Sequence, residues 1–250
     1  MMNNKILVGN LKMNLTYNKV YDLVQSIIDN NCLTNKNIII ACSYIDLLSL
    51  IDKFSIYKIS FAAQNCSHKE IGAYTGEISA KMLSAINTKY VIIGHSERKN
   101  IFNESDDIVL QKLHLSLKNN LTPILCIGEN DFLRRKNIHY NYIKSQIEYF
   151  LLNIDKYLMK KIIIAYEPVW AINSNIKIPY AEIQNMHIFI KKTIFSIFNH
   201  INMDNVKVIY GGNCNVENTP FILQEKDIDG VMVGRSSIDK NKINKLISLV

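Results

Sequence analysis

Eight short and nearly continuous apolar runs are the feature that most constrains the fold of this chain. Each run is rich in Ile, Val or Leu on both faces, as expected for strands buried on both sides of a parallel sheet. The runs lie at 5–10, 37–42, 59–65, 89–95, 122–129, 161–168, 206–212 and 228–234. The longer stretches between most of them repeat apolar residues every three or four positions, which predicts helices. Clear examples are 17–30, 105–119, 138–157, 180–199 and 216–224.

Alternation of strands and helices indicates βαβ units and a parallel sheet. Eight such units in 250 residues fit a closed (β/α)8 barrel of eight parallel strands inside an outer ring of helices. A doubly wound open sheet is the alternative, but the first turn, GNLKMN at 9–14, lacks the usual GxGxxG pattern. No linker or low-complexity tract divides the chain, so we expect a single α/β domain over 1–250.

The formal net charge is +7, and the basic residues are scattered apart from the short run Arg134-Arg135-Lys136. This spread favours a solvated surface, although the summed field could also attract an anionic substrate. A nucleic-acid-binding protein would need a clustered basic face with aromatic residues, so no such partner is predicted.

Cysteine and histidine spacing gives no sign of a metal site or a disulfide framework. The five cysteines form no CxxC pair, and the six histidines have no metal-ligand spacing, which favours reduced thiols and no metal. The N-terminus has no apolar signal segment, and no run reaches the roughly 18 apolar residues of a membrane span. We therefore expect a cytoplasmic protein with no membrane partner.

Polar residues follow several of the predicted strands at the barrel end where chemistry is expected. Asn10 and Lys12 follow the first run, His95 follows the fourth and Glu167 follows the sixth. Other strand ends carry Gln64-Asn65, Ser96-Glu97 and Glu129. The predicted strands therefore place Asn, Lys, His and Glu side chains together at one end of the barrel.

Each of these residues has a structural and a chemical interpretation. Glu167 alone could be an ion-paired rim carboxylate, but apolar neighbours and Trp170 are expected to raise its pKa and make it a base near pH 7. His95 could be a core histidine, yet backbone N–H groups at a following helix start would keep its ring neutral. Lys12 could face solvent, or it could hold an anion and balance developing negative charge.

Glycines follow the last two predicted strands. Gly211, Gly212 and Gly234 are candidates for the phosphate site that such barrels form after strands seven and eight. They could equally serve only to relieve backbone strain at tight turns. Spacing alone does not choose between these roles.

Six segments, in this order across essentially the whole chain, resemble the triosephosphate isomerase family: VGNLKMN, GAYTGE, IIGHSER, PILCIGE, AYEPVWAI and YGGN. The resemblance implies a TIM barrel that acts as an intramolecular aldose–ketose isomerase. It would interconvert dihydroxyacetone phosphate and D-glyceraldehyde 3-phosphate through an enediolate, in glycolysis and gluconeogenesis, with no metal or cofactor.

The resemblance also implies residue roles. Glu167 matches the catalytic base, and His95 matches the neutral electrophile that polarises the carbonyl. Lys12 matches the lysine that stabilises the enediolate, and Asn10 matches a supporting hydrogen-bond donor. Two further residues would hold Lys12 and His95 in place: Ser96 and Glu97.

The segment GAYTGE (72–77) resembles the loop that joins two subunits in this family. Thr75 would then lie beside the active site of a partner subunit, and the chain would form a homodimer. An ordinary loop with glycines at its turns is the alternative.

Several positions depart from the family pattern around the phosphate site. Leu11 replaces the usual Trp, a packing change. Asn213 stands where the family usually has Ser and can still donate to phosphate through its backbone N–H. Gly234, at the end of the eighth run, is the other phosphate candidate at this site. Arg235 replaces a glycine, so we expect strain of about 1 kcal/mol or more if the position needs a positive φ. We expect Arg235 either to turn outward or to add a charge-assisted contact to phosphate.

The segment after AYEPVWAI, which the resemblance implies is a lid over the site, departs most from the family pattern. Asn173, Ser174, Asn175 and Ile176 take the places of the family's usual Gly-Thr-Gly-Lys. Asn173 keeps the backbone N–H that would reach the phosphate, and Asn tolerates left-handed backbone better than most residues. We expect an active isomerase whose lid closure is altered. Two rival hypotheses are a different sugar-phosphate isomerase or lyase, and a weakened barrel kept as a binding protein.

Overall fold

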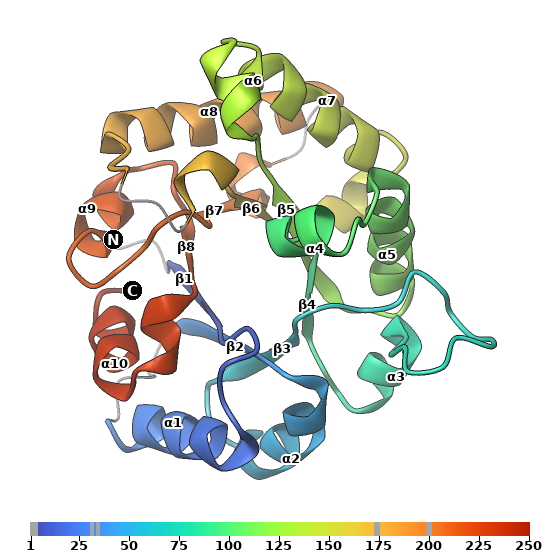
Figure 1. The fold of residues 1–250 in the computed structure, drawn as a ribbon, viewed down its shortest axis with the longest axis vertical. Coiled ribbons are helices and arrows are strands. Elements are labelled where there is room, and N and C mark those ends of the chain that lie inside the picture. The colour runs from blue at the N-terminus through green and yellow to red at the C-terminus, as the bar shows by residue number, and fades with distance from the viewer. Residues whose placement is uncertain (1–4, 31–32, 34–35, 173–175, 199–201) are drawn as a thin grey trace.

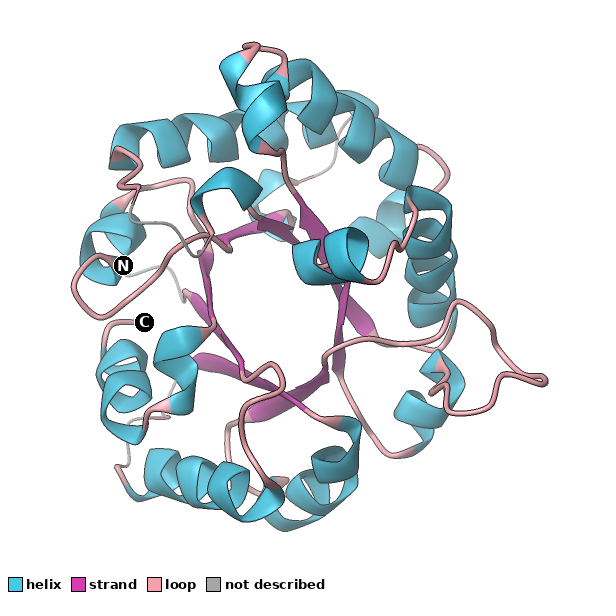
Figure 2. Ribbon diagram, in the orientation of Figure 1, coloured by secondary structure: helices cyan, strands magenta, loops and turns pink. Residues whose placement is uncertain are grey.

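Eight parallel strands close into one barrel in this computed structural model, which describes residues 5–30, 33, 36–172, 176–198 and 202–250. Viewed down the barrel, the strands form the inner ring and the helices surround it (Figures 1 and 2). The strands are β1 (Ile6–Asn10), β2 (Asn37–Cys42), β3 (Ser60–Ala63), β4 (Tyr90–Ile93), β5 (Thr122–Ile127), β6 (Ile163–Tyr166), β7 (Lys207–Tyr210) and β8 (Gly230–Val233). Each strand pairs in parallel with its sequence neighbours, and β8 closes the ring on β1 with Ile6 opposite Gly230. The predicted fold class is confirmed.

The outer ring consists of helices of very different lengths. The α-helices are α1 (Tyr17–Asp29), α2 (Tyr44–Phe54), α3 (Ala80–Ala85), α4 (Ser96–Ile101), α5 (Asp106–Lys118), α6 (Asp131–Arg135), α7 (His139–Leu151), α8 (Tyr180–Ile197), α9 (Thr219–Gln224) and α10 (Lys240–Ser248). Short 3-10 helices are η1 (Lys156–Lys161), η2 (Val169–Ala171), η3 (Met203–Asn205) and η4 (Arg235–Ile238). The helix predicted over 138–157 is therefore wrong beyond Leu151, where a turn and η1 follow.

Helices form where apolar spacing and caps agree. In α1, the residues Val20, Leu23, Val24 and Ile27 are buried along one side, which is the spacing of a helix lying on a sheet. Ser105 begins α5 as a cap, because its hydroxyl accepts from the N–H of Ile108 at 3.3 Å. Within the described ranges, no helix is both long and apolar enough to cross a bilayer.

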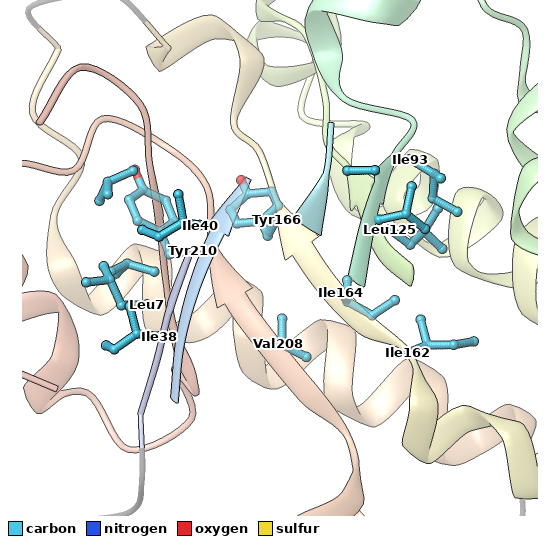
Figure 3. Packing of buried hydrophobic residues seen from close by; sticks show 14 of the residues in the cluster. Leu7, Ile38, Ile40, Ile93, Leu125, Ile162, Ile164, Tyr166, Val208 and Tyr210 are labelled. Atoms are coloured by element: carbon cyan, nitrogen blue, oxygen red, sulfur yellow. The ribbon is translucent and has the colours of Figure 1, made fainter. Parts of the chain in front are cut away.

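Two apolar layers follow from the alternation of side chains along each strand. One layer lies between the strands and the helices and includes Leu7, Ile38, Ile164 and Val208 (Figure 3). The other fills the barrel interior and includes Val8, Ala165 and Met232 among the buried residues that face inward. Because the interior is packed, the space for a site lies beyond its last layer.

Candidate active site

One cleft at the carboxyl ends of the strands contains all four residues that the sequence singled out for chemistry. Asn10, Lys12, His95 and Glu167 line it together with residues that follow β7 and β8. Asn10 comes two positions after Val8, and Glu167 comes two positions after Ala165, so both continue the inward-facing row. Both side chains are buried, as is His95.

The carboxylate of Glu167 is held between two groups from the segment after β4. Its Oε2 accepts a hydrogen bond from the backbone N–H of Ser96 at 2.9 Å. Its Oε1 lies 3.2 Å from Nε2 of His95, although the orientation of the pair does not make a well-formed hydrogen bond. The base candidate and the electrophile candidate are therefore in direct contact.

Backbone groups fix the orientation of the His95 ring. His95 precedes α4, and its Nδ1 accepts from the backbone N–H of Glu97 at 3.2 Å. A nitrogen that accepts a hydrogen bond carries no proton, so the proton of the neutral ring belongs on Nε2. That nitrogen is the one that faces Glu167, which makes neutral His95 a hydrogen-bond donor within the cleft.

Lys12 reaches the cleft through an unusual backbone conformation, with φ of 51°. Its backbone N–H donates to Oδ1 of Asn10 at 3.1 Å, and its carbonyl accepts from Nε2 of Gln64 at 3.0 Å. Its ammonium group forms an ion pair with Glu97. Gln64, to which the sequence assigned no role, is thus one of the groups that hold this conformation.

The cleft is also lined by four residues from the segments after β7 and β8: Gly212, Asn213, Gly234 and Arg235. Arg235 begins η4 and is exposed, and its Nη2 donates to Oδ1 of Asn213 at 3.3 Å. The strain expected at Arg235 is wrong: its φ is not positive, so the position does not require glycine. The predicted lid residues Asn173, Ser174 and Asn175 lie outside the described part of the chain.

Comparison with known proteins agrees with this geometry. The family model for triosephosphate isomerase matches residues 5–250. The triosephosphate isomerase of Flavobacterium psychrophilum is 40% identical over 239 residues, covering 95% of each chain. That of Finegoldia magna is 38% identical over 251 residues, covering 99% of each chain.

A crystal structure of triosephosphate isomerase from Bartonella henselae superposes with a TM-score of 0.88 at 28% identity, covering 98% of each chain. The chain belongs to the triosephosphate isomerase family. The resemblance inferred from the six segments is confirmed, and so is the enzyme class, an isomerase.

A buried cluster just after β6 was not foreseen from the sequence. Glu129 is fully buried after β5, and its Oε1 accepts from the indole N–H of Trp170 at 2.8 Å and from the hydroxyl of Tyr166 at 3.1 Å. Burial raises the pKa of Glu129, and these two donors oppose that rise. The cluster thus fixes η2, the short helix that follows Glu167.

Arg134 also belongs to this cluster, against the expectation of a solvated basic run. Its guanidinium lies 5.1 Å from the centre of the Trp170 ring and 3.6 Å from Glu129 Oε1, and it forms an ion pair with Glu182 on α8. Its side chain is only 17% exposed, whereas the side chain of Arg135 is 78% exposed. The surface interpretation was therefore wrong for Arg134.

Thr75 lies in the exposed segment that joins β3 to α3. This segment, drawn in teal, extends well beyond the ring of helices (Figure 1). In the described part of the chain, no group of three His, Cys, Asp or Glu side chains comes together as metal ligands would.

Proposed function

We propose that this chain interconverts dihydroxyacetone phosphate and D-glyceraldehyde 3-phosphate by proton transfer through an enediolate. The observation that carries the proposal is the 3.2 Å approach of Glu167 Oε1 to His95 Nε2, within a cleft that Lys12 also lines. Proton transfer next to a carbonyl needs a base, a donor to the carbonyl oxygen and a compensating positive charge. These three residues supply all of them, with no cofactor.

Each polar group then has a defined part in the reaction. Glu167 moves the proton between the two carbon atoms, and His95 donates from Nε2 to the carbonyl oxygen. Lys12 balances the negative charge of the enediolate. Asn10 uses Oδ1 to accept from Lys12 N–H, so its amide NH2 is the group that can donate to substrate.

Two neighbouring residues position these groups. Glu97 contacts both Lys12 and His95, consistent with the role that the resemblance implied. Ser96 acts on Glu167 through its backbone N–H, which stabilises the charged carboxylate. Proton abstraction therefore requires Glu167 to exchange this bond for a contact with substrate carbon.

The phosphate group would lie at the end of the cleft formed by Gly212, Asn213 and Gly234, where backbone N–H groups can bind anions. Asn173 would add a further backbone donor from the lid. We also propose a cytoplasmic location and a single domain over residues 1–250.

A homodimer completes the proposal. Exposed apolar side chains follow four strands that are adjacent in the barrel: Met13 after β1, Ile45 after β2, Ile71 after β3 and Phe102 after β4. Met13 is 100% exposed and Ile71 is 88% exposed, which is costly for a monomer in water. Sedimentation of the purified protein should give the mass of two chains, whereas Ile71→Asp should shift it toward one.

A coupled assay of glyceraldehyde 3-phosphate isomerisation tests the activity. Glu167→Gln keeps the shape of the side chain but removes the base, so kcat should fall by about 10²–10⁴-fold. A parent protein without isomerase activity, or a Glu167→Gln variant as active as the parent, would contradict the proposal.

A further inference from the structure

Arg235 and Asn213 join the two loops that form the phosphate end of the cleft. The guanidinium Nη2 of Arg235, after β8, donates to Oδ1 of Asn213, after β7, at 3.3 Å. Both residues line the same cleft as Lys12, His95 and Glu167. The bridge therefore lies at the mouth of the site rather than elsewhere on the surface.

The loop that carries Asn213 is fixed by its own hydrogen bonds. The carbonyl of Asn213 accepts from Nδ2 of Asn218 at 2.7 Å. Asn215 and Asn218 bond to each other twice, each donating its backbone N–H to the side-chain oxygen of the other at 2.8 Å. These bonds hold the backbone that presents the Asn213 amide to Arg235.

The charge of Arg235 is not neutralised by an acidic side chain within the described ranges. Its hydrogen-bond acceptor is a neutral amide. The other cation that lines the cleft, Lys12, is already paired with Glu97. A guanidinium has five N–H donors, so the bond to Asn213 leaves most of its donors available to an anion.

We propose that Arg235, oriented by Asn213, is a second cation that recognises the phosphate dianion of the substrate from the mouth of the cleft. This inference rests on the proposed function, because it concerns the phosphate end of the same site. A guanidinium binds phosphate with charge and geometry together, which backbone N–H groups alone cannot do. Arg235 thus adds to the preference for doubly charged phosphate esters over uncharged trioses.

Inorganic phosphate is the probe that tests this role. Its dissociation constant is measured by calorimetric titration of the resting protein, and its inhibition constant is measured in the isomerase assay. Arg235→Gln should raise both constants about fivefold to tenfold, as expected for loss of one charge-assisted contact at a partly exposed site. It should also raise KM more than it lowers kcat, and it should weaken the dependence of kcat/KM on ionic strength.

Three further variants separate the effects on phosphate affinity of the charge of Arg235, of its orientation by Asn213 and of the net charge of the protein. Arg235→Lys keeps the charge and should recover part of the affinity. Asn213→Ala keeps Arg235 but removes its acceptor, so the affinity should fall between those of the parent and Arg235→Gln. Lys160→Gln removes one exposed charge from η1, which precedes β6 and so lies at the opposite end of the barrel. It should leave phosphate binding unchanged.

The inference is overturned if Arg235→Gln leaves the phosphate dissociation constant within twofold of the parent value. It is also overturned if Lys160→Gln raises that constant as much, since net charge would then explain the effect. The titration needs no turnover, so it is independent of the proposed function. A protein that lacks isomerase activity but loses phosphate affinity in Arg235→Gln would refute the isomerase and retain the phosphate contact.

Discussion

Gly211→Ala is predicted to slow the reaction by moving the base, without changing any group that takes part in the chemistry. A β-carbon at position 211 would lie 3.0 Å from Cγ of Glu167 and 3.2 Å from Cε of Met232. Ordinary contact begins at 3.4 Å, so the Glu167 side chain must move by about 0.4 Å. The backbone of Gly211 cannot yield as easily, because its N–H donates to the carbonyl of Tyr166 at 2.8 Å.

The size of the effect follows from that displacement. A misplacement of about 1 Å in an active site can cost about 10²-fold in rate, so about 0.4 Å corresponds to roughly sixfold if the logarithm of the rate scales with distance. The loss should fall on kcat, because Asn213 and Gly234, which are proposed to bind the phosphate, are not among the groups that the new β-carbon meets. Overpacking should also lower the free energy of unfolding by about 1–3 kcal/mol.

A double-mutant cycle shows whether the effect passes through Glu167. The isomerase assay is run on the parent, Gly211→Ala, Glu167→Ala and the double variant, with thermal unfolding as the control for folding. The sixfold loss should disappear in the Glu167→Ala background, since no carboxylate remains to be moved. An equal loss in both backgrounds, or a folded Gly211→Ala variant within twofold of the parent kcat, would refute this reasoning.

Two further predictions concern buried polar groups. Glu129→Ala leaves the N–H of Trp170 and the hydroxyl of Tyr166 without their acceptor, so the free energy of unfolding should fall by about 2–4 kcal/mol. Because Trp170 is the only tryptophan, its emission in urea titrations reports this site directly, and an unchanged midpoint would contradict the prediction. Burial lowers the pKa of His187 to about 3, so its contribution to stability is complete above pH 6.5 and is lost as the pH falls toward 3. About 2 kcal/mol should be lost by pH 5, and His187→Gln should remove that part of the loss; an equal acid dependence in both proteins would exclude His187 as its source.

The strands were predictable because burial on both faces leaves a strong signal in the sequence. The run 37–42 coincides with β2, whereas the run 161–168 begins too early, since Lys161 still belongs to η1. The short helices α3, α4 and α6 were not predicted, because five or six residues make less than two turns and show no measurable apolar period. Length alone does not explain the outcome, since α2 and α10, with 11 and 9 residues, were not predicted either, whereas α9, with 6 residues, lies within the helix predicted over 216–224.

Some features of the candidate site could also be recognised from the sequence, whereas others could not. Side chains at strand ends, such as Glu167, could be recognised because their residue type and position are both visible in the sequence. The bond from Ser96 to Glu167 could not, since it uses a backbone N–H that every residue but proline has. The pairing of Arg134 with Glu182 also escaped prediction, because nothing local marks two residues that meet only after the barrel closes.

The alternation of side chains explains how a packed barrel makes room for a substrate. The position two residues beyond the last interior side chain of a strand should face inward again. On β1 and β6 that position carries a polar residue, Asn10 and Glu167, and both line the cleft. On β7 and β8 it carries glycine, Gly211 and Gly234, and these two residues also line the cleft. On these four strands the cleft is thus the next layer of the core, with two side chains absent and the other two polar.

Lys12 and His95 do not follow this alternation, and the backbone shows how they still reach the cleft. Lys12 has φ of 51°, and the residue before His95, Gly94, has φ of 68°. At Gly94 a β-carbon would also approach Val109 Cγ1 to 2.9 Å, so both conformation and space require glycine there. The alternation of the strands supplies the proposed base and the space for a substrate, whereas positive-φ turns supply the proposed electrophile and cation. Substitutions at these turns should therefore impair catalysis while leaving the barrel interior intact.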